Sequence, residues 1–156
     1  MADYRFLTTW LLDCSPLACW EAIHEPERWP DWWPGVLSVE RLADGNGDGV
    51  GSVYRNAWRG VIPYTVRFDA HTTRVERPHV IELEARGELA GTGRWRIFDG
   101  PAVAVTYEWS VRTTRPWMNA LAPVARPLFA WNHNAVMRRG GEGLAGLLGA
   151  RLLASS

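Results

Sequence analysis

His133 is the residue in this 156-residue chain that is best suited to acid–base chemistry. An imidazole titrates near neutral pH, so it could hydrogen-bond a ligand oxygen or act as a general acid or base. Phe129, His133 and Val136 follow the spacing of one helical face, which predicts that the imidazole points into the protein interior. A core histidine paired with a backbone carbonyl or with a tyrosine such as Tyr107 would share this spacing, and the pattern leaves both interpretations open.

Tyr64 and Tyr107 are the other candidates, because each lies on the apolar side of a segment in which apolar and polar residues alternate. A phenol hydroxyl can orient a substrate or pair with another buried group. Acid–base catalysis usually needs two positioned titratable groups with different pKa values, yet no clearly alternating segment directs an aspartate, glutamate or arginine to its apolar side. An enzyme built on His133 and the two tyrosines would work mainly by holding a flexible substrate in one conformation.

The composition argues against several other chemistries. All 17 basic residues are arginine, so the chain has no lysine for a Schiff base, a pyridoxal phosphate or a phosphate-binding loop. The four histidines are scattered, so we expect neither a metal site nor a cofactor. Cys14 and Cys19 are expected on different sides of a short helix, as free thiols.

The charge and hydropathy patterns limit the partners. The net charge is zero, which argues against a nucleic-acid partner. No apolar run approaches the roughly 18 residues that a membrane-spanning helix needs, and the N-terminus has no signal-peptide pattern. We therefore expect a cytoplasmic protein with no stable membrane insertion.

The elements that must position these residues follow from the spacing of apolar side chains. A strict two-residue alternation predicts antiparallel strands with one face in a core and one in water. In residues 80–88, Leu83 falls on the apolar face and Glu88 on the polar face. We predict seven strands, at residues 4–12, 36–42, 50–58, 64–70, 80–88, 94–97 and 103–111.

Two short helices and one long helix complete the expected elements. Ser15-Pro16 predicts a helix start, Pro26 its end, and residues 27–33 a second short helix. Because Pro123 and Pro127 interrupt the pattern, the long C-terminal helix is expected to start at Pro127 and to reach Leu148. Its glycines either break it or let its backbone lie close to the sheet, and we favour the close approach.

The order of these elements resembles the START-like superfamily, also called SRPBCC, and in particular its polyketide cyclase/dehydratase and lipid-transport branch. This resemblance implies one α+β domain over residues 1–156 with the helix-grip fold, in which a curved antiparallel sheet wraps around a long C-terminal helix. Superfamily members bind lipids, sterols, polyketides or plant hormones in a cavity between sheet and helix, and a minority catalyse cyclisation or dehydration. The residues that carry the resemblance are Pro16–Trp20, Trp29–Val36, Trp131–His133, Val136–Arg138 and Gly141–Leu144.

On this fold, the alternation predicts an aromatic and uncharged cavity, although a solid core is the alternative. In residues 50–58, either Tyr54, Asn56 and Trp58 or Arg55 would face inward. Trp32 and Trp33 are expected at the cavity entrance, unless they only pack the short helices. The predicted ligand-binding residues are Trp10, Tyr64, Phe68, Leu83, Trp95, Tyr107, Trp109, Phe129, His133 and Val136.

Three functions fit these patterns. The leading hypothesis is the binding of one hydrophobic small molecule, such as a lipid, a polyketide or an aromatic metabolite. The alternative is a polyketide cyclase/dehydratase that uses His133 with Tyr107 or Tyr64. The third is a non-catalytic adaptor that acts through exposed tryptophans in Trp29–Pro34, and well-shielded indoles would count against it.

Overall fold

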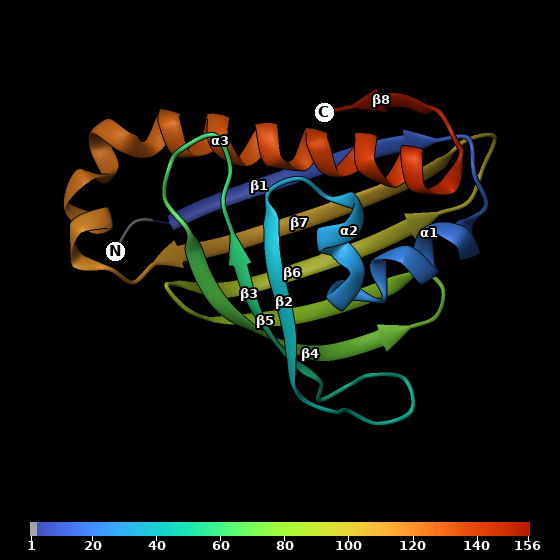
Figure 1. Cartoon of the computed structure of the whole chain (residues 1–156), viewed down its shortest axis with the longest axis horizontal. Helices are drawn as coiled ribbons and strands as arrows, with labels where there is room; N and C mark the ends of the chain where they lie inside the picture. The colour runs from blue at the N-terminus through green and yellow to red at the C-terminus, as the bar shows by residue number, and fades with distance from the viewer. Residues whose placement is uncertain (1–2) are drawn as a thin grey trace.

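The computed structural model describes residues 3–156, which form one curved antiparallel sheet packed against a long helix (Figure 1). The sheet has eight strands in the order β2-β3-β4-β5-β6-β7-β1-β8. This α+β architecture is the predicted helix-grip arrangement, with one strand more than the seven expected. The strands are β1 (Asp3–Leu12), β2 (Val36–Ala43), β3 (Val53–Trp58), β4 (Val66–Glu76), β5 (Val80–Gly87), β6 (Leu89–Phe98), β7 (Val103–Thr113) and β8 (Leu152–Ser155).

The additional strand, β8, follows the long helix. Gly149 ends that helix in the left-handed conformation, with a φ of 62°, and the chain then turns back along β1. Thr9 and Ser156 exchange both backbone hydrogen bonds, at 2.9 and 3.0 Å. Four residues are too few to show a two-residue alternation, so the sequence pattern did not separate β8 from the helix.

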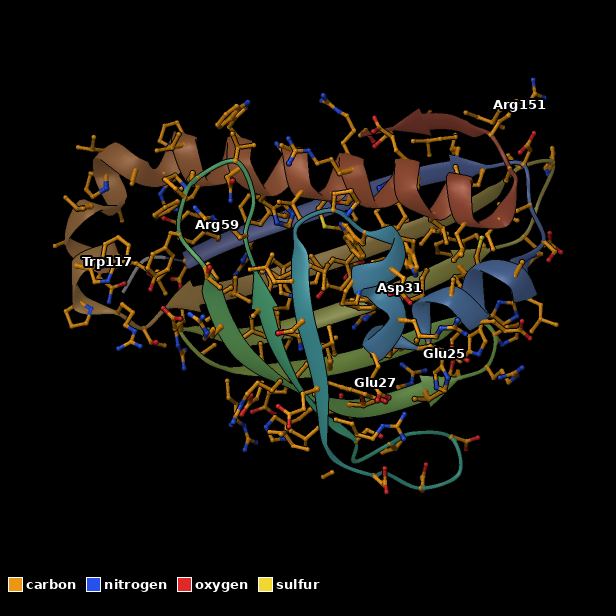
Figure 2. All side chains as sticks on the ribbon, in the orientation of Figure 1. Glu25, Glu27, Asp31, Arg59, Trp117 and Arg151 are labelled. Carbon is orange, nitrogen blue, oxygen red and sulfur yellow. The ribbon has the colours of Figure 1, made fainter. Side chains whose placement is uncertain are left out.

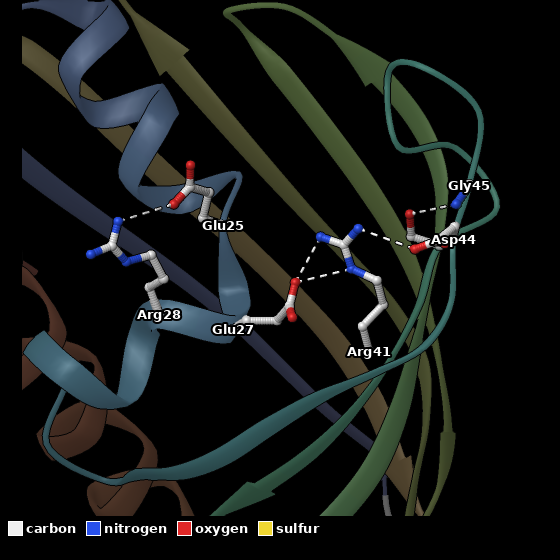
Figure 3. Close-up of polar contacts among 7 residues, drawn as sticks. Glu25, Glu27, Arg28, Arg41, Asp44 and Gly45 are labelled. Carbon is white, nitrogen blue, oxygen red and sulfur yellow. Dashed lines mark hydrogen bonds and ion pairs between the residues drawn. The ribbon is translucent and has the colours of Figure 1, made fainter.

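The short helices after β1 are confirmed. In α1 (Pro16–Ile23), the Ser15 hydroxyl accepts a hydrogen bond from the Ala18 amide at 3.1 Å and caps the first turn. The 3-10 helix η1 (Pro26–Arg28) leads directly into α2 (Trp29–Trp32). Arg41 of β2 binds both Glu27 of η1, at 2.7 Å, and Asp44, at 3.2 Å (Figure 3). These ion pairs are exposed, so they orient the segment more than they stabilise it.

The long helix α3 (Pro116–Leu148) starts at Pro116, so the predicted start at Pro127 is wrong. Pro116 occupies the first turn, where a missing amide proton costs nothing. Pro123 and Pro127 lie inside the helix, where each removes one hydrogen bond and bends the axis without ending it. The bend is visible in Figure 1, and Figure 2 places Trp117 of the first turn at one end of the molecule.

The glycines in the second half of α3 allow a close approach, as the sequence predicts. A Cβ atom on Gly140 would lie 2.3 Å from the Trp33 ring, and one on Gly141 would lie 2.8 Å from the Trp10 ring. On Gly143 it would lie 1.9 Å from the Trp32 carbonyl oxygen. The helix backbone therefore rests directly on α2 and β1, and α3 runs without interruption to Leu148.

Trp33 is the centre of the main core, so its predicted place at the cavity entrance is wrong. Its exposed fraction is 0%, and its indole nitrogen donates a hydrogen bond to the Val136 carbonyl at 2.9 Å. Trp32 stacks on it and is 9% exposed. Both indoles are shielded, which counts against an adaptor that docks through this segment. The Trp33 ring lies within 6.0 Å of the rings of Trp10, Trp29, Trp32, Trp58 and Trp95.

Candidate functional site

A cavity of about 170 Å³ lies between the first part of α3 and the concave face of the sheet. Strands β1, β4 and β7 line it from the sheet, and the segment between β3 and β4 closes one side. Among the predicted ligand-binding residues, the ones that line this cavity are Tyr64, Phe68, Tyr107, Trp109, Phe129, His133 and Val136.

A second cavity, of about 60 Å³, lies next to the first. Leu83 and Trp95 line this smaller space, and Phe68 and Tyr107 border both cavities. Trp10, which we predicted as a ligand contact, lines neither cavity, because Gly141 of α3 lies directly over its ring. The predicted ligand-binding residues therefore fall into three groups: those that line the main cavity, those that line its smaller neighbour, and Trp10, which lies in the core.

Several lining residues were missed by the sequence prediction. Tyr4 and Phe6 line the main cavity from β1, where they share the alternation of Trp10. Burial shows which residues of β3 face inward, since Asn56 is 3% exposed whereas Arg55 is exposed. Trp58, which belongs to the same inward alternative as Asn56, also lines the cavity. The lining residues outside both this alternative and the predicted ligand-binding set are, besides Tyr4 and Phe6, Gly60, Ile62, Val66, Leu89, Val111, Thr113, Met118, Asn132 and Met137.

Asn132 fixes one wall of the cavity to the helix. Its side-chain oxygen accepts a hydrogen bond from the Ile62 amide at 2.9 Å, across the space between α3 and the segment after β3. A Cβ atom on Gly60 would lie 2.3 Å from the same oxygen, so this segment must carry glycine to approach the helix. No pattern in the sequence indicates this contact, because the two residues are far apart in the chain.

His133 lies in the cavity wall as a neutral ring. It stacks on Phe6 with 3.9 Å between the ring centroids. Burial lowers the pKa of the imidazole to about 4, so the ring carries no proton charge at pH 7. Its Nε2 atom is buried with no hydrogen-bond partner among residues 3–156. The pairing with a carbonyl or with Tyr107 that the sequence left open does not involve this nitrogen.

Tyr107 keeps its proton under all physiological conditions. Burial raises the pKa of its hydroxyl, since the ring is enclosed by protein and no charge stabilises a phenolate. The ring stacks between Trp95 and Trp109, with centroid distances of 4.2 and 5.6 Å. A Cβ atom on Gly93 would lie 2.6 Å from the hydroxyl oxygen, so the glycine makes room for the phenol.

Glu88 is a carboxylate that lies behind the cavity wall, and its predicted place on the outer face is wrong. The side chain is buried at the turn between β5 and β6, where Gly87 has a φ of 125° and the strand alternation ends. The carboxylate accepts hydrogen bonds from the Tyr64 hydroxyl and, at 3.1 Å, from the Arg67 amide. Arg115 forms an ion pair with it at 3.4 Å.

Tyr64 connects this carboxylate to the cavity. Its ring lines the cavity and lies just before β4, and its hydroxyl donates to Glu88. Burial raises the pKa of the hydroxyl, and the hydrogen bond to Glu88 raises it further. The Glu88 carboxylate is therefore hydrogen-bonded to a residue of the cavity wall, although no residue that lines the cavity carries a charged side chain.

We expect His133 to make the protein less stable in acid. The imidazole has a pKa near 6.5 when unfolded and about 4 when folded, so only the unfolded state takes up this proton between those pH values. The contribution to stability is complete above about pH 6.5 and falls by roughly 3 kcal/mol as the pH approaches 4. Urea unfolding at several pH values between these limits measures the free energy of unfolding, and His133→Phe is expected to remove this part of its pH dependence. An unchanged pH dependence in the variant would contradict the low pKa of His133.

Among residues 3–156, no group of His, Cys, Asp and Glu side chains could hold a metal ion, and no helix is long and apolar enough to cross a membrane.

The sulfur atoms of Cys14 and Cys19 lie 2.7 Å apart, so their expected placement on different sides of the helix is wrong. Cys14 precedes the first turn of α1 and folds back onto it.

The comparisons with solved structures identify the same fold. The di-domain ARO/CYC BexL from the BE-7585A biosynthetic pathway is 18% identical, with a TM-score of 0.75 over 96% of this chain. This chain spans 51% of BexL. A START superfamily protein from Mycobacterium smegmatis is 17% identical, with a TM-score of 0.74 over 93% of this chain and 97% of that protein. The Zhui aromatase/cyclase from Streptomyces sp. R1128 is 17% identical, with a TM-score of 0.61 over 94% of this chain and 96% of that protein.

No curated protein sequence matches the chain at a significant level. A family model described as polyketide cyclase/dehydrase and lipid transport matches residues 5–149, which is nearly the whole chain. The strand order, the long helix and the cavity between them agree with that match. The chain therefore belongs to the polyketide cyclase/dehydrase and lipid transport family.

Proposed function

We propose that this protein binds one hydrophobic small molecule in the cavity between α3 and the sheet. The observation that carries the proposal is a partly open cavity of about 170 Å³ whose wall has aromatic rings and no charged side chain. Such a wall favours an apolar ligand, because a charged group would lose its hydration without gaining an ion pair. Lipids, polyketides and aromatic metabolites all contain parts that fit this description.

The size of the cavity favours a compact ligand. An apolar cavity of about 150 Å³ holds one benzene ring, whereas sites for drug-sized molecules measure about 300–1,000 Å³. A one- or two-ring compound therefore fits the main cavity with little rearrangement. A longer ligand would need Trp58, Phe68 or Tyr107 to move, because these three side chains border both the main cavity and its smaller neighbour.

A neutral fluorescent probe tests this proposal. 1-Aminonaphthalene, a neutral two-ring fluorophore, is expected to bind with saturation at one site per chain and to be displaced by unlabelled two-ring compounds. Native mass spectrometry of protein purified from cells should show one added small molecule on part of the population. Weak, non-saturating fluorescence together with a single ligand-free mass would contradict a binding cavity.

A second candidate function, that of a polyketide cyclase or dehydratase, is favoured by the Tyr64–Glu88 pair. The Tyr64 oxygen could remove a proton from a carbon between two substrate carbonyls while its own proton passes to Glu88. The resulting enolate carbon would attack a ketone of the same chain, and the new alkoxide would take the proton back. Loss of that hydroxyl as water, with a proton from the neighbouring carbon, would then form the aromatic ring. His133, with a pKa of about 4, is too weak a base for this step, and its neutral ring would serve as a hydrogen-bond partner for the substrate.

Tyr64→Phe separates the two functions. The variant keeps the ring in the cavity wall and removes only the hydroxyl, so probe affinity should stay within about threefold of the wild type. In Tyr64→Phe, the cyclisation of an acyclic poly-β-ketone thioester should slow by about 100-fold or more, and Glu88→Gln should slow it by a similar factor. The absorbance of the aromatic product measures the rate. Equal rates in both variants and the wild type would remove this pair from any mechanism.

A further inference from the structure

The first half of α3 carries a row of large apolar side chains on its outer face. Their spacing of four, three, four and three residues places them on one side of a helix. Exposed apolar groups that form a continuous row on a soluble domain usually mark an interaction surface. We call this row the α3 stripe, and its members, with their exposed fractions, are Trp117 (44%), Leu121 (53%), Val124 (83%), Leu128 (48%) and Trp131 (53%).

The α3 stripe contains no charged residue. The remaining exposed side chains between Pro116 and Trp131 are prolines and Ala120, apart from Arg126. The Arg126 guanidinium lies 4.7 Å from the centre of the Tyr4 ring and donates to the Asp3 carbonyl, so it is held toward β1. Trp117 lies at the outer end of this part of the helix (Figure 2), where its ring packs edge-on against Tyr64 with 5.1 Å between the centroids and stays 44% exposed.

The first charges that continue this face are positive. Arg138 and Arg139 are exposed, and they follow Trp131 by seven and eight residues, which places them on the side of the α3 stripe. Glu142, exposed one turn after Arg138, is the one acidic residue of α3, so the three charges sum to +1. An apolar row with a tryptophan at each end and arginines beyond it is the composition of helices that lie in the surface of a membrane.

We propose that the α3 stripe docks the protein reversibly on an anionic lipid bilayer. The apolar side chains would enter the boundary between headgroups and acyl chains, and Arg138 and Arg139 would contact acidic headgroups. This role is independent of the proposed ligand and differs from membrane insertion, which α3 cannot achieve because it is not apolar on all sides.

A second copy of the chain fits this surface less well. Sixteen helical residues extend about 24 Å, and a helix face is on the order of 10 Å wide, so the α3 stripe covers roughly 250 Å². A stable dimer needs about 800 Å² from each partner. A lipid surface has no such minimum, because shallow insertion of a few side chains together with charge attraction is sufficient.

The position of the α3 stripe gives this docking a consequence for the cavity. The inner side of the same helical segment carries Met118, Phe129 and His133, which line the cavity. A docked protein would therefore hold its cavity about one helix diameter, roughly 10 Å, from the acyl layer. An apolar ligand would have only a short distance to travel between the bilayer and the cavity.

Vesicle sedimentation tests the proposal with the full chain. We expect binding to phosphatidylcholine vesicles that contain about 30 mol % phosphatidylserine, with a partition coefficient that falls as salt is added. Val124→Glu should lower the coefficient at least tenfold, since it places a charge in the middle of the α3 stripe at the most exposed position. Replacing both Arg138 and Arg139 by Gln should lower it about 30-fold on anionic vesicles and not on pure phosphatidylcholine.

Leu7→Glu is the matched control, because Leu7 is 64% exposed on β1 and points away from α3. Brominated lipids should quench the fluorescence of the wild type, and the double variant Trp117→Leu, Trp131→Leu should bind with little of this quenching. Equal binding by wild type and Val124→Glu, or no binding to any vesicle, would overturn the proposal. A lipid-free dimer in analytical ultracentrifugation that Val124→Glu dissociates would assign the α3 stripe to a second copy instead.

Discussion

Gly143→Ala is expected to lower the free energy of unfolding by about 3 kcal/mol, at the upper end of the range for overpacked sites. The new methyl group would lie 1.9 Å from the Trp32 carbonyl oxygen, and backbone atoms cannot rotate away as a side chain can. Either α3 or α2 must shift, and a shift there disturbs the contacts of Trp33 with both elements. Urea unfolding followed by circular dichroism measures the change.

Gly146→Ala is the matched control for this prediction. Gly146 lies in the same helix one turn later, and no atom lies within 4 Å of the position where a Cβ would be placed. Because alanine favours the helix by about 0.8–1 kcal/mol over glycine, this variant should be slightly more stable than the wild type. Equal gains in the two variants would contradict the prediction, because helix propensity alone would then account for both and the close approach at Gly143 would carry no cost.

Val66→Trp is expected to reduce the affinity for the naphthyl probe at least 100-fold. Val66 lines the main cavity, and an indole in its place would occupy the space in which the ligand is buried. The free energy of unfolding should stay within about 1 kcal/mol of the wild type, because filling a cavity does not by itself destabilise a core. Fluorescence titration and urea unfolding on the same preparation measure both quantities.

Val61→Trp controls for the added indole. Val61 lies in the segment between β3 and β4, is 40% exposed and does not line the cavity. This variant should bind the probe as the wild type does. Wild-type affinity in Val66→Trp would place the ligand elsewhere, and the smaller cavity next to Leu83 and Trp95 would be the first place to look.

The inner face of the sheet could be predicted where the strands alternate strictly. In β7, Tyr107 and Trp109 border the cavity, as their alternation requires. Phe129, His133 and Val136 also line the cavity from the predicted face of α3. These positions depend on local periodicity, which a sequence displays directly.

The errors lie where local periodicity ends. Glu88 occupies a turn, so the strand pattern assigned it to the wrong side, and its pairing with Tyr64 depends on a contact between distant residues. Pro127 was read as a helix start because a proline usually interrupts a helix, whereas α3 bends and continues. Trp10 and Trp33 have the right polarity for a cavity wall, but the glycines opposite them bring the helix backbone close enough to exclude a ligand.

The backbone pairing between Thr9 and Ser156 makes the end of the chain part of the sheet. Strand β8 covers the side of β1 that faces away from β7. Without residues 152–156, the amides of β1 on that side would lack partners and could add a strand from another molecule. Deleting residues 152–156 is therefore an aggregation hazard.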